Sequence, residues 1–361
     1  MTRRSVTTRV ATGLTLVAFA ATGCSLAPSA ADGARGGTAP PEEQRRTAVA
    51  ASTPAPTPTD IAPGLEQFYQ QKLEWKECLS RSLQCAKLRV PIDYEQPDGR
   101  TIELALMRVR AKEPDQRLGS LVINPGGPGG SGVQFASNAP VIFGAPVKAR
   151  YDIVGFDPRG VAGSAPVDCV SDREMDRFLA ADATPDNARE KRELLALAEK
   201  FAKGCAERTG ELLAHVSTEN VVRDLDVLRG ALGDEQLNYM GASYGTYVGA
   251  LYAERFPQRV GRMVLDAGLD PELSSKDLGL GQAKGFELAL DSFLRDCASR
   301  ADCPLGDNRK EAYATLEGLI DETDQHPLRG DDQREVTQAL AMTGIVTAMY
   351  SDLLWGQLRV A

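Results

Sequence analysis

The sequence predicts an α/β fold in which helices cover both faces of a mostly parallel β-sheet. Three observations predict it. Two antiparallel strand patterns come first, short apolar strands separated by helical stretches follow, and a Gly-x-Ser-x-Gly motif joins one of those strands to the next helix. Apolar strands that alternate with helices are typical of a parallel sheet buried on both faces.

The strands are expected in a definite order. Residues 85–94 and 101–109 alternate or run apolar around a turn at 96–99, which predicts a hairpin. Apolar runs then predict strands at 121–124, 151–156, 237–242 and 262–266. Helical patterns cover 173–205, 247–256 and 286–294. The first of these helices is expected to lie over one face of the sheet or to form an insertion.

The N-terminus predicts export. Three arginines precede an apolar run at 14–21 that is too short to span a bilayer, so residues 1–24 are expected to be a signal peptide. Residues 21–24 resemble a bacterial lipobox, with Ala where Leu is usual, which predicts a lipid on Cys24 and attachment to the outer face of the cell membrane. Cleavage with release of the protein is the alternative, and a buried N-terminal helix is a further one.

Residues 25–63 are rich in Ala, Pro, Thr and Gly and hold few large apolar side chains. Such a segment buries too little surface to offset the entropy lost on ordering. It is expected to be a disordered linker, or else a pro-segment that is removed.

Composition excludes several classes of partner. The net charge is −9, and basic residues cluster only at the extreme N-terminus, so no nucleic-acid partner is expected. With two histidines and no Cys-x-x-Cys motif, a zinc site is not expected either. No cofactor motif is present.

Seven cysteines support export. If Cys24 carries a lipid, six remain, and an even number in an exported protein predicts disulfides. Two close pairs favour sequential local bridges, which leaves the middle two cysteines to join each other. The expected bridges are Cys78–Cys85, Cys169–Cys205 and Cys297–Cys303. Isolated buried thiols are the alternative.

The Gly-x-Ser-x-Gly motif occupies residues 241–245 (Gly-Ala-Ser-Tyr-Gly). It follows the strand at 237–242 and opens the next helix, so Ser243 stands where a nucleophile elbow would hold it. In such a turn two small residues let strand and helix pass close to a serine whose hydroxyl is exposed at the end of the sheet. The motif predicts a serine hydrolase that forms an acyl-enzyme on Ser243.

A glycine-rich loop, Asn124 to Gly132 (NPGGPGGSG), follows the strand at 121–124. It lacks the ending of a P-loop and the spacing of a dinucleotide-binding fingerprint. In the fold predicted here, this position supplies backbone N–H groups to an oxyanion hole, and the predicted donors are Gly127 and Tyr244. A purely structural glycine turn is the alternative.

A second turn, Gly155 to Gly160, follows the strand at 151–156. Its Asp157 and Arg159 are expected to pair and to fix loops near the elbow rather than to act in catalysis.

A serine nucleophile needs an acid and a histidine, and both are expected after the serine in the chain. His215 precedes Ser243, so its order is wrong. His326 follows the serine but lies in a polar turn, where a solvent-exposed loop residue is expected rather than the base. Asp266, at the end of the strand at 262–266, is a candidate acid.

Several ordered motifs agree with one known family. They are Trp75–Cys78, Val90–Tyr94, Asn124–Gly132, Gly155–Gly160, Asp224–Asp226, Gly241–Gly245 and Tyr252–Pro257. Together they resemble the secreted tripeptidyl aminopeptidases of actinobacteria, an α/β-hydrolase family related to the proline iminopeptidases. The resemblance runs from about Trp75 to Asp270 and continues more weakly through the helical region.

The resemblance implies an α/β-hydrolase core at 64–270 and a helical lid region at 271–361. It implies release of tripeptides and other short peptides from free N-termini by Ser-Asp-His chemistry, with the Asp and His after the lid. The sequence ends within an apolar helical pattern at 345–358, so the triad Asp and His and the C-terminal part of the sheet are expected to be missing. An esterase or other acyl hydrolase and a non-catalytic envelope binding module are the alternatives.

Overall fold

The computed structural model describes residues 61–330 and 334–360. The expected signal peptide at 1–24, with Cys24, lies outside the described residues, as does the predicted linker up to residue 60. No helix in the described part of the chain is long and apolar enough to cross a membrane.

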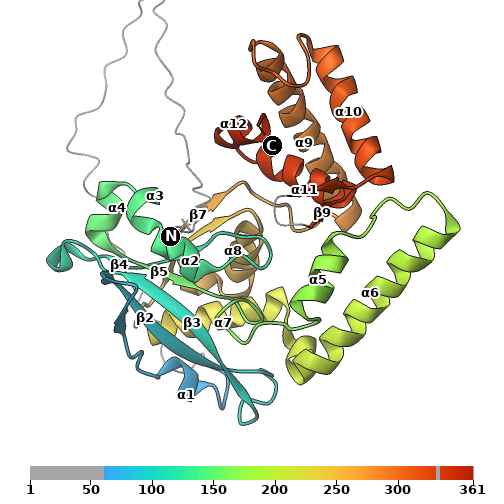
Figure 1. Ribbon diagram of the computed structural model, residues 1–361. Helices are drawn as coiled ribbons and strands as arrows, with labels where there is room; N and C mark the ends of the chain where they lie inside the picture. The colour runs from blue at the N-terminus through green and yellow to red at the C-terminus, as the bar shows by residue number, and fades with distance from the viewer. Residues whose placement is uncertain (1–60, 331–333, 361) are drawn as a thin grey trace, which may run out of the picture. The chain divides into compact units, whose positions relative to one another are not determined.

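A mixed sheet of seven strands organises the described core (Figure 1). Its strands are β1 (Lys76–Cys78), β2 (Ser80–Pro91), β3 (Thr101–Val109), β4 (Gly119–Asn124), β5 (Tyr151–Phe156), β6 (Leu237–Ala242) and β7 (Val260–Asp266). They run in the order β1-β2-β3-β5-β4-β6-β7. The neighbouring pairs β1–β2, β2–β3 and β3–β5 are antiparallel. The pairs β5–β4, β4–β6 and β6–β7 are parallel.

The predicted strands are present, and two of them, at 151–156 and 237–242, have the predicted bounds. The hairpin begins earlier than expected, at Ser80, because β2 also pairs with the short unpredicted strand β1. The turn at 96–99 is closed by the Gly99 N–H, which donates to the Gln96 carbonyl at 2.9 Å.

Helices fill the intervals between the strands. They are α1 (Glu66–Tyr69), α2 (Gly132–Ser137), α3 (Ala139–Ile142), α4 (Ala145–Arg150), α5 (Asp172–Leu179), α6 (Ala188–Thr209), α7 (Thr218–Ala231), α8 (Tyr244–Arg255), α9 (Ser275–Ala298), α10 (Arg309–Gln325), α11 (Gln338–Met349) and α12 (Trp355–Leu358). The described residues also contain four short 3₁₀ helices, which are η3 (Pro114–Gln116), η4 (Gly210–His215), η5 (Pro257–Arg259) and η6 (Asp352–Leu354).

The two faces of the sheet contribute to separate apolar cores. Leu104 and Val122 pack in one core with side chains of α1, α7 and α8. Met107 and Ile123 lie on the same two strands, β3 and β4. They pack in the other core with side chains of α2 and α3. Successive residues of a strand point to opposite faces, so continuous apolar strands serve both cores. Helices therefore cover both faces, as the sequence predicts (Figure 1).

The region expected to form a lid is helical and has a core of its own. Phe293 and Leu294 of α9 pack there with Leu316 of α10 and Ile345 of α11. The unpredicted strands β8 (Leu328–Arg329) and β9 (Glu335–Val336) pair between α10 and α11. A lid function for this region remains a prediction.

Three disulfides are present in the described residues. They join Cys78 to Cys85, Cys169 to Cys205, and Cys297 to Cys303. These are the pairs expected from the sequence. The first joins the end of β1 to the hairpin strand β2, the second connects the start of the α5 segment to α6, and the third closes the end of α9.

The single helical pattern at 173–205 is in fact two helices. α5 ends at Leu179, and α6 begins at Ala188 after a segment that contains Pro185. Asn187 caps α6, since its side chain accepts from the Arg189 and Glu190 N–H groups. Pro185 disfavours a helical conformation at the residue before it, and the Asn187 cap begins α6. These two residues mark the break between the helices, which the charge pattern at 173–205 does not show.

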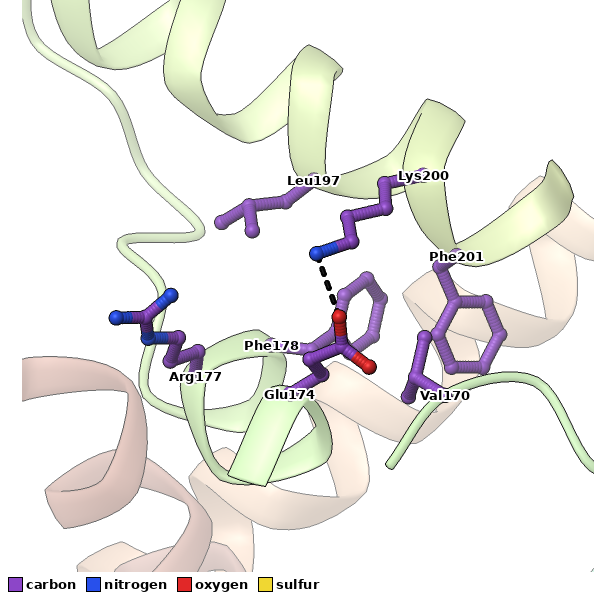
Figure 2. Close-up of a pocket in the computed structure, with 7 residues that line it drawn as sticks. All are labelled: Val170, Glu174, Arg177, Phe178, Leu197, Lys200 and Phe201. Carbon is purple, nitrogen blue, oxygen red and sulfur yellow. Dashed lines mark ion pairs between the residues drawn. The ribbon is translucent and has the colours of Figure 1, made fainter. Parts of the chain in front are cut away.

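Side chains of α5 and α6 enclose a small pocket of about 40 Å³ (Figure 2). Phe178 and Phe201 stack there with ring centroids 4.6 Å apart. At the edge of the pocket Glu174 and Lys200 form an ion pair, with 2.6 Å between the Oε1 and Nζ atoms. The ion pair and the disulfide both connect α6 to the α5 segment.

Replacement of Glu174 by Gln should weaken the α5–α6 contact at neutral pH but not near pH 2. Hydrogen bonds from Lys200 and Ser171 lower the pKa of Glu174 from 4.5 to about 2. A carboxyl group with a lowered pKa stabilises the fold above its ordinary pKa, and this contribution is lost as the pH falls through the folded-state value. The measurement is amide hydrogen-exchange protection of α5 in the variant and the wild type.

The difference in protection should be largest above pH 4.5 and should shrink toward pH 2. Glu199→Gln, at an exposed position of α6, is the matched control. A difference for Glu174→Gln that stayed constant over this pH range would contradict the assignment.

Candidate active site

Ser243 lies in the sharp turn between β6 and α8. β6 ends at Ala242 and α8 begins at Tyr244, so Ser243 occupies the N-cap position of the helix. Its backbone angles are φ 53° and ψ −123°. L-residues rarely adopt such angles, which cost about 1–3 kcal/mol and are found mostly at functional turns. The turn therefore has the strand–serine–helix form of a nucleophile elbow.

The elbow requires glycine on both sides of the serine. A Cβ on Gly241 would lie 2.3 Å from the carbonyl oxygen of Gly245. A Cβ on Gly245 would lie 2.8 Å from the carbonyl oxygen of Asn124. Both distances are shorter than real Cβ atoms tolerate, so neither position accepts a side chain without a shift of the backbone.

The glycine-rich loop after β4 lies directly against the elbow. Gly126 has φ 90°, and a Cβ there would be 2.4 Å from the Ala242 carbonyl oxygen and 3.0 Å from the Tyr244 nitrogen. Asn124 fixes the start of the loop, because its Oδ1 accepts from the Gly126 N–H at 2.8 Å. The fold thus brings the loop and Ser243, which are far apart in the sequence, into contact.

The two predicted oxyanion donors lie in these adjoining segments. Tyr244 is the first residue of α8, so no carbonyl within the helix can accept from its N–H. Gly127 follows Gly126 in the loop and has φ 117°. The Tyr244 side chain points elsewhere, since its hydroxyl bonds the Thr218 Oγ1 at 2.7 Å. That Gly127 and Tyr244 bind an oxyanion remains a prediction.

Asp157 fixes the far end of the glycine-rich loop. Its buried carboxylate accepts from the Ser131 hydroxyl at 2.6 Å and from the Val133 N–H at 3.1 Å. Its other oxygen accepts from the Gly163 N–H at 3.0 Å. Because Ser131 also caps α2, Asp157 holds the loop and the helix together.

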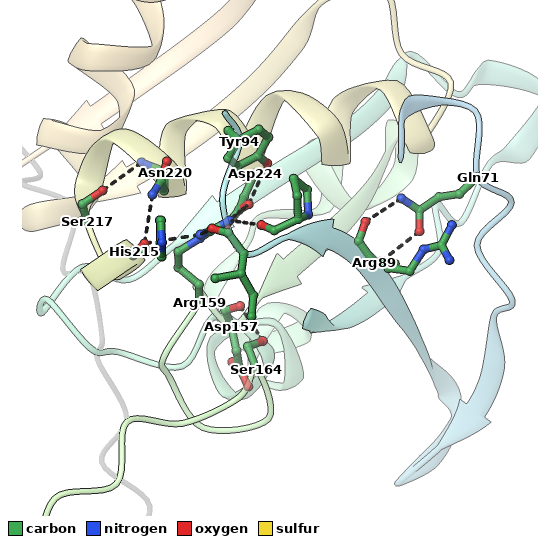
Figure 3. A network of polar contacts seen from close by, with 12 residues as sticks. Gln71, Arg89, Tyr94, Asp157, Arg159, Ser164, His215, Ser217, Asn220 and Asp224 are labelled. Atoms are coloured by element: carbon green, nitrogen blue, oxygen red, sulfur yellow. Dashed lines mark hydrogen bonds and ion pairs between the residues drawn. The ribbon is translucent and has the colours of Figure 1, made fainter. Parts of the chain in front are cut away.

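The expectation that Asp157 and Arg159 pair is wrong. Arg159 is fully buried and forms a bidentate ion pair with Asp224 of α7 (Figure 3). Its Nη2 donates to Oδ1 at 2.7 Å, and its Nε donates to Oδ2 at 2.8 Å. Its other bonds go to the backbone carbonyl groups of Pro91, Ile92 and His215. Asp157 is buried as well, but its oxygens already accept from three donors, whereas each oxygen of Asp224 accepts from one nitrogen of the guanidinium.

The ion pair keeps Arg159 charged inside the protein. Burial acts to lower the pKa of Arg159, but the charge of Asp224 and the hydrogen bonds to it raise that pKa above its ordinary value. Tyr94 donates to the same carboxylate at 2.7 Å. This group joins the Gly155–Gly160 turn, the end of β2 and α7.

A family model for the α/β hydrolase fold matches residues 119–348, from β4 through the elbow into α11. The match covers more than half of the chain. The protein belongs to the α/β-hydrolase family.

This α/β hydrolase is similar to several curated proteins. It is 42% identical over 306 residues to "Serine protease Hip1" of Mycobacterium tuberculosis, covering 80% of this chain and 58% of that protein. It is 39% identical over 298 residues to "Tripeptidyl aminopeptidase" of Streptomyces lividans, covering 78% and 54%. It is 39% identical over 281 residues to "Carboxylesterase B" of M. tuberculosis, covering 76% and 53%. The chain spans little more than half the length of these curated relatives.

Within the described residues, neither histidine of the α/β hydrolase bonds the side chain of Ser243. Among residues 61–330 and 334–360, no hydrogen bond joins the Ser243 side chain to a histidine. His215 lies in η4, where its carbonyl accepts from Arg159. His326 caps the end of α10 with its side chain 75% exposed, as expected of a loop residue. The candidate acid Asp266 contacts the elbow through its carbonyl, which accepts from the Ser243 N–H at 3.0 Å.

A second buried acid of α7, Asp226, joins the elbow helix of the α/β hydrolase to its neighbours. It accepts from the Tyr69 hydroxyl at 2.6 Å and from the Tyr252 hydroxyl of α8 at 2.9 Å. Arg229 and Arg259 form ion pairs with it. Burial acts to raise the pKa of Asp226, but the hydrogen bond and charge of Arg229, with Tyr69 and Arg259, hold that pKa below its ordinary value.

The partners of the two α7 acids were not predicted, although the sequence contains a signal for them. Asp224 and Asp226 lie in the stretch Val221–Leu228, whose other residues are apolar and buried except for Arg223. Carboxylates inside an apolar helical run indicate buried ion pairs, since a buried charge needs a partner. In the described part of the α/β hydrolase, no group of three or more His, Cys, Asp or Glu side chains is placed to hold a metal ion.

Proposed function

We propose that the protein is a serine peptidase that releases short peptides, tripeptides among them, from free N-termini. The observation that carries the proposal is the strained Ser243 at the β6–α8 turn, with the Gly126 backbone against it. A serine in this geometry is exposed at the end of the sheet, where it can attack a carbonyl. The names of two relatives, a serine protease and a tripeptidyl aminopeptidase, support peptides as the substrate class.

In the proposed reaction the Ser243 hydroxyl attacks the carbonyl carbon of the scissile peptide bond. Its proton passes to a general base, the role of histidine in serine hydrolases. The N–H groups of Gly127 and Tyr244 bind the oxyanion of the tetrahedral intermediate, a contribution typically worth about 2.7–4 kcal/mol per donor. The C–N bond then breaks, the amine leaves with a proton, and water hydrolyses the acyl-enzyme.

A matched substrate panel tests the reaction class. Tripeptidyl p-nitroanilides with a free amine should be hydrolysed, whereas the same compounds with an acetylated amine should not. Aminoacyl p-nitroanilides and short p-nitrophenyl esters complete the panel. Equal turnover of free and acetylated peptides would contradict the requirement for a free N-terminus.

An esterase is the second candidate, favoured by the similarity to a carboxylesterase. The fold does not fix the substrate, and ester and amide hydrolysis use the same acyl-enzyme. Turnover of esters with no turnover of any amide would establish this reading in place of the peptidase. A non-catalytic binding module would show neither activity and no labelling by a fluorophosphonate.

We further propose that the protein is exported and anchored by a lipid on Cys24. The N-terminal sequence pattern supports this, and three disulfides are typical of an oxidising compartment outside the cytosol. The mass of the mature N-terminal peptide, recovered from the membrane fraction, decides between lipidation and simple release.

A further inference from the structure

The backbone of Ser243 is fixed on both sides by hydrogen bonds. Its N–H donates to the Asp266 carbonyl at 3.0 Å, and its carbonyl accepts from the Thr246 N–H at 2.8 Å. The same carbonyl accepts from the Thr246 hydroxyl at 2.7 Å. Strained backbone angles persist only where the surroundings determine them, so these three bonds hold the serine in its unusual conformation.

Thr246 also binds the loop that follows β7. Its Oγ1 accepts from the Leu269 N–H at 2.8 Å while its hydroxyl hydrogen goes to the Ser243 carbonyl. A hydroxyl has one donor and two acceptor sites, so one side chain serves both partners. Thr246 is 2% exposed, so solvent has little access to its side chain.

The elbow and the post-β7 loop are therefore joined at two points. One is the backbone bond from Ser243 to Asp266, and the other is the bridge through Thr246 to Leu269. Between these points Ala267 has φ 56°, a conformation that a non-glycine residue keeps only when its neighbours hold it. The two strained residues, Ser243 and Ala267, are thus stabilised by a single set of bonds.

We propose that Thr246 is a positioning residue whose hydroxyl couples the orientation of Ser243 to the conformation of residues 267–270. The inference rests on the proposed function, because it requires Ser243 to be the nucleophile. Loss of the hydroxyl leaves the Leu269 N–H without its buried acceptor and frees the Ser243 carbonyl from one of two donors. The serine then samples orientations that do not react, and small misplacements of a reacting group cost up to about 100-fold in rate.

Two conservative variants separate this role from simple packing. Thr246→Val keeps the branched shape and loses the hydroxyl, whereas Thr246→Ser keeps the hydroxyl and loses a methyl group. If the hydroxyl positions the serine, Val is impaired and Ser is not. If Thr246 only fills space, the order is reversed.

The experiment uses the whole protein and measures the rate constant for labelling of Ser243 by a fluorophosphonate. Thr246→Val should label about 10- to 100-fold more slowly than the wild type, with kcat reduced and KM nearly unchanged. Thr246→Ser should restore both values to within about threefold. Thr343→Val, which removes an exposed helix hydroxyl bonded to the Ala339 carbonyl, is the matched control.

Hydrogen exchange at the Leu269 amide gives a readout that does not depend on activity. Thr246→Val should exchange faster there than the wild type, and Thr246→Ser should not. If Thr246→Val fails to fold, Thr246→Ala takes its place with the same expected losses. Wild-type labelling and Leu269 protection in Thr246→Val would overturn the inference, whereas absence of labelling in the wild type would overturn the proposed function instead.

Discussion

Ser243→Ala is expected to abolish acyl-enzyme formation. The substitution removes only the hydroxyl oxygen and keeps the Cβ, so the strained turn and the contacts of Gly126 with it are retained. Loss of a serine nucleophile typically lowers kcat by on the order of 10⁶. The measurement is fluorophosphonate labelling followed by peptide mapping, together with turnover of the tripeptidyl substrate.

Ser292→Ala is the matched control, since Ser292 is exposed on α9 and bonds only the Leu288 carbonyl. It should label and turn over as the wild type does. Peptide mapping should place the label on Ser243 alone. Labelling of Ser243→Ala at the wild-type rate would show that another serine is the nucleophile.

Asp226→Asn is expected to destabilise the fold by about 3–5 kcal/mol, the usual cost of removing one partner from a buried ion pair. The Asp226 side chain is fully buried, and the variant leaves the guanidinium groups of Arg229 and Arg259 without its negative charge. The tyrosine hydroxyls donate to different oxygens of Asp226, so the single amide oxygen of an asparagine can accept from only one of them. The variant therefore loses the negative charge and one buried hydrogen bond. Urea denaturation at neutral pH measures it.

The destabilisation should also depend on pH in a defined direction. The pKa of Asp226 lies below its ordinary value, so the wild type gains stability from the carboxylate above that value and loses it in acid. The difference between wild type and variant should therefore shrink as the pH falls below 3.8. Asp115→Asn, at an exposed site, should change the urea midpoint very little. A cost below about 1 kcal/mol for Asp226→Asn would mean that the buried charges are compensated elsewhere.

Local sequence was sufficient for features determined by neighbouring residues. The buried strands β5 and β6 were predicted to the residue because short, mainly apolar runs bounded by polar turns are typical of buried parallel strands. The elbow was predictable because the steric demands at Gly241 and Gly245 arise within a few residues of Ser243, apart from the contact with Asn124.

Features that depend on distant residues were not predictable in the same way. Arg159 had a carboxylate two residues away, and only the fold shows that its partner is Asp224, on a helix that packs beneath the turn. The bridge through Thr246 was missed for the same reason, since a threonine in the first turn of a helix carries no distinguishing pattern. The role of Thr246 is visible only in the fold, because the loop after β7 brings Leu269 back to the elbow.

The connectivity of the disulfides bears on how the chain is oxidised. Each bridge in the described residues joins two cysteines that are consecutive along the sequence, with separations of 7, 36 and 6 residues. No bridge encloses or crosses another. If the protein is exported N-terminus first and Cys24 carries a lipid, as proposed above, each of these six cysteines emerges directly before or after its partner, so pairing in order of emergence gives these three bridges. We expect such a chain to form them by vectorial oxidation with little need of an isomerase.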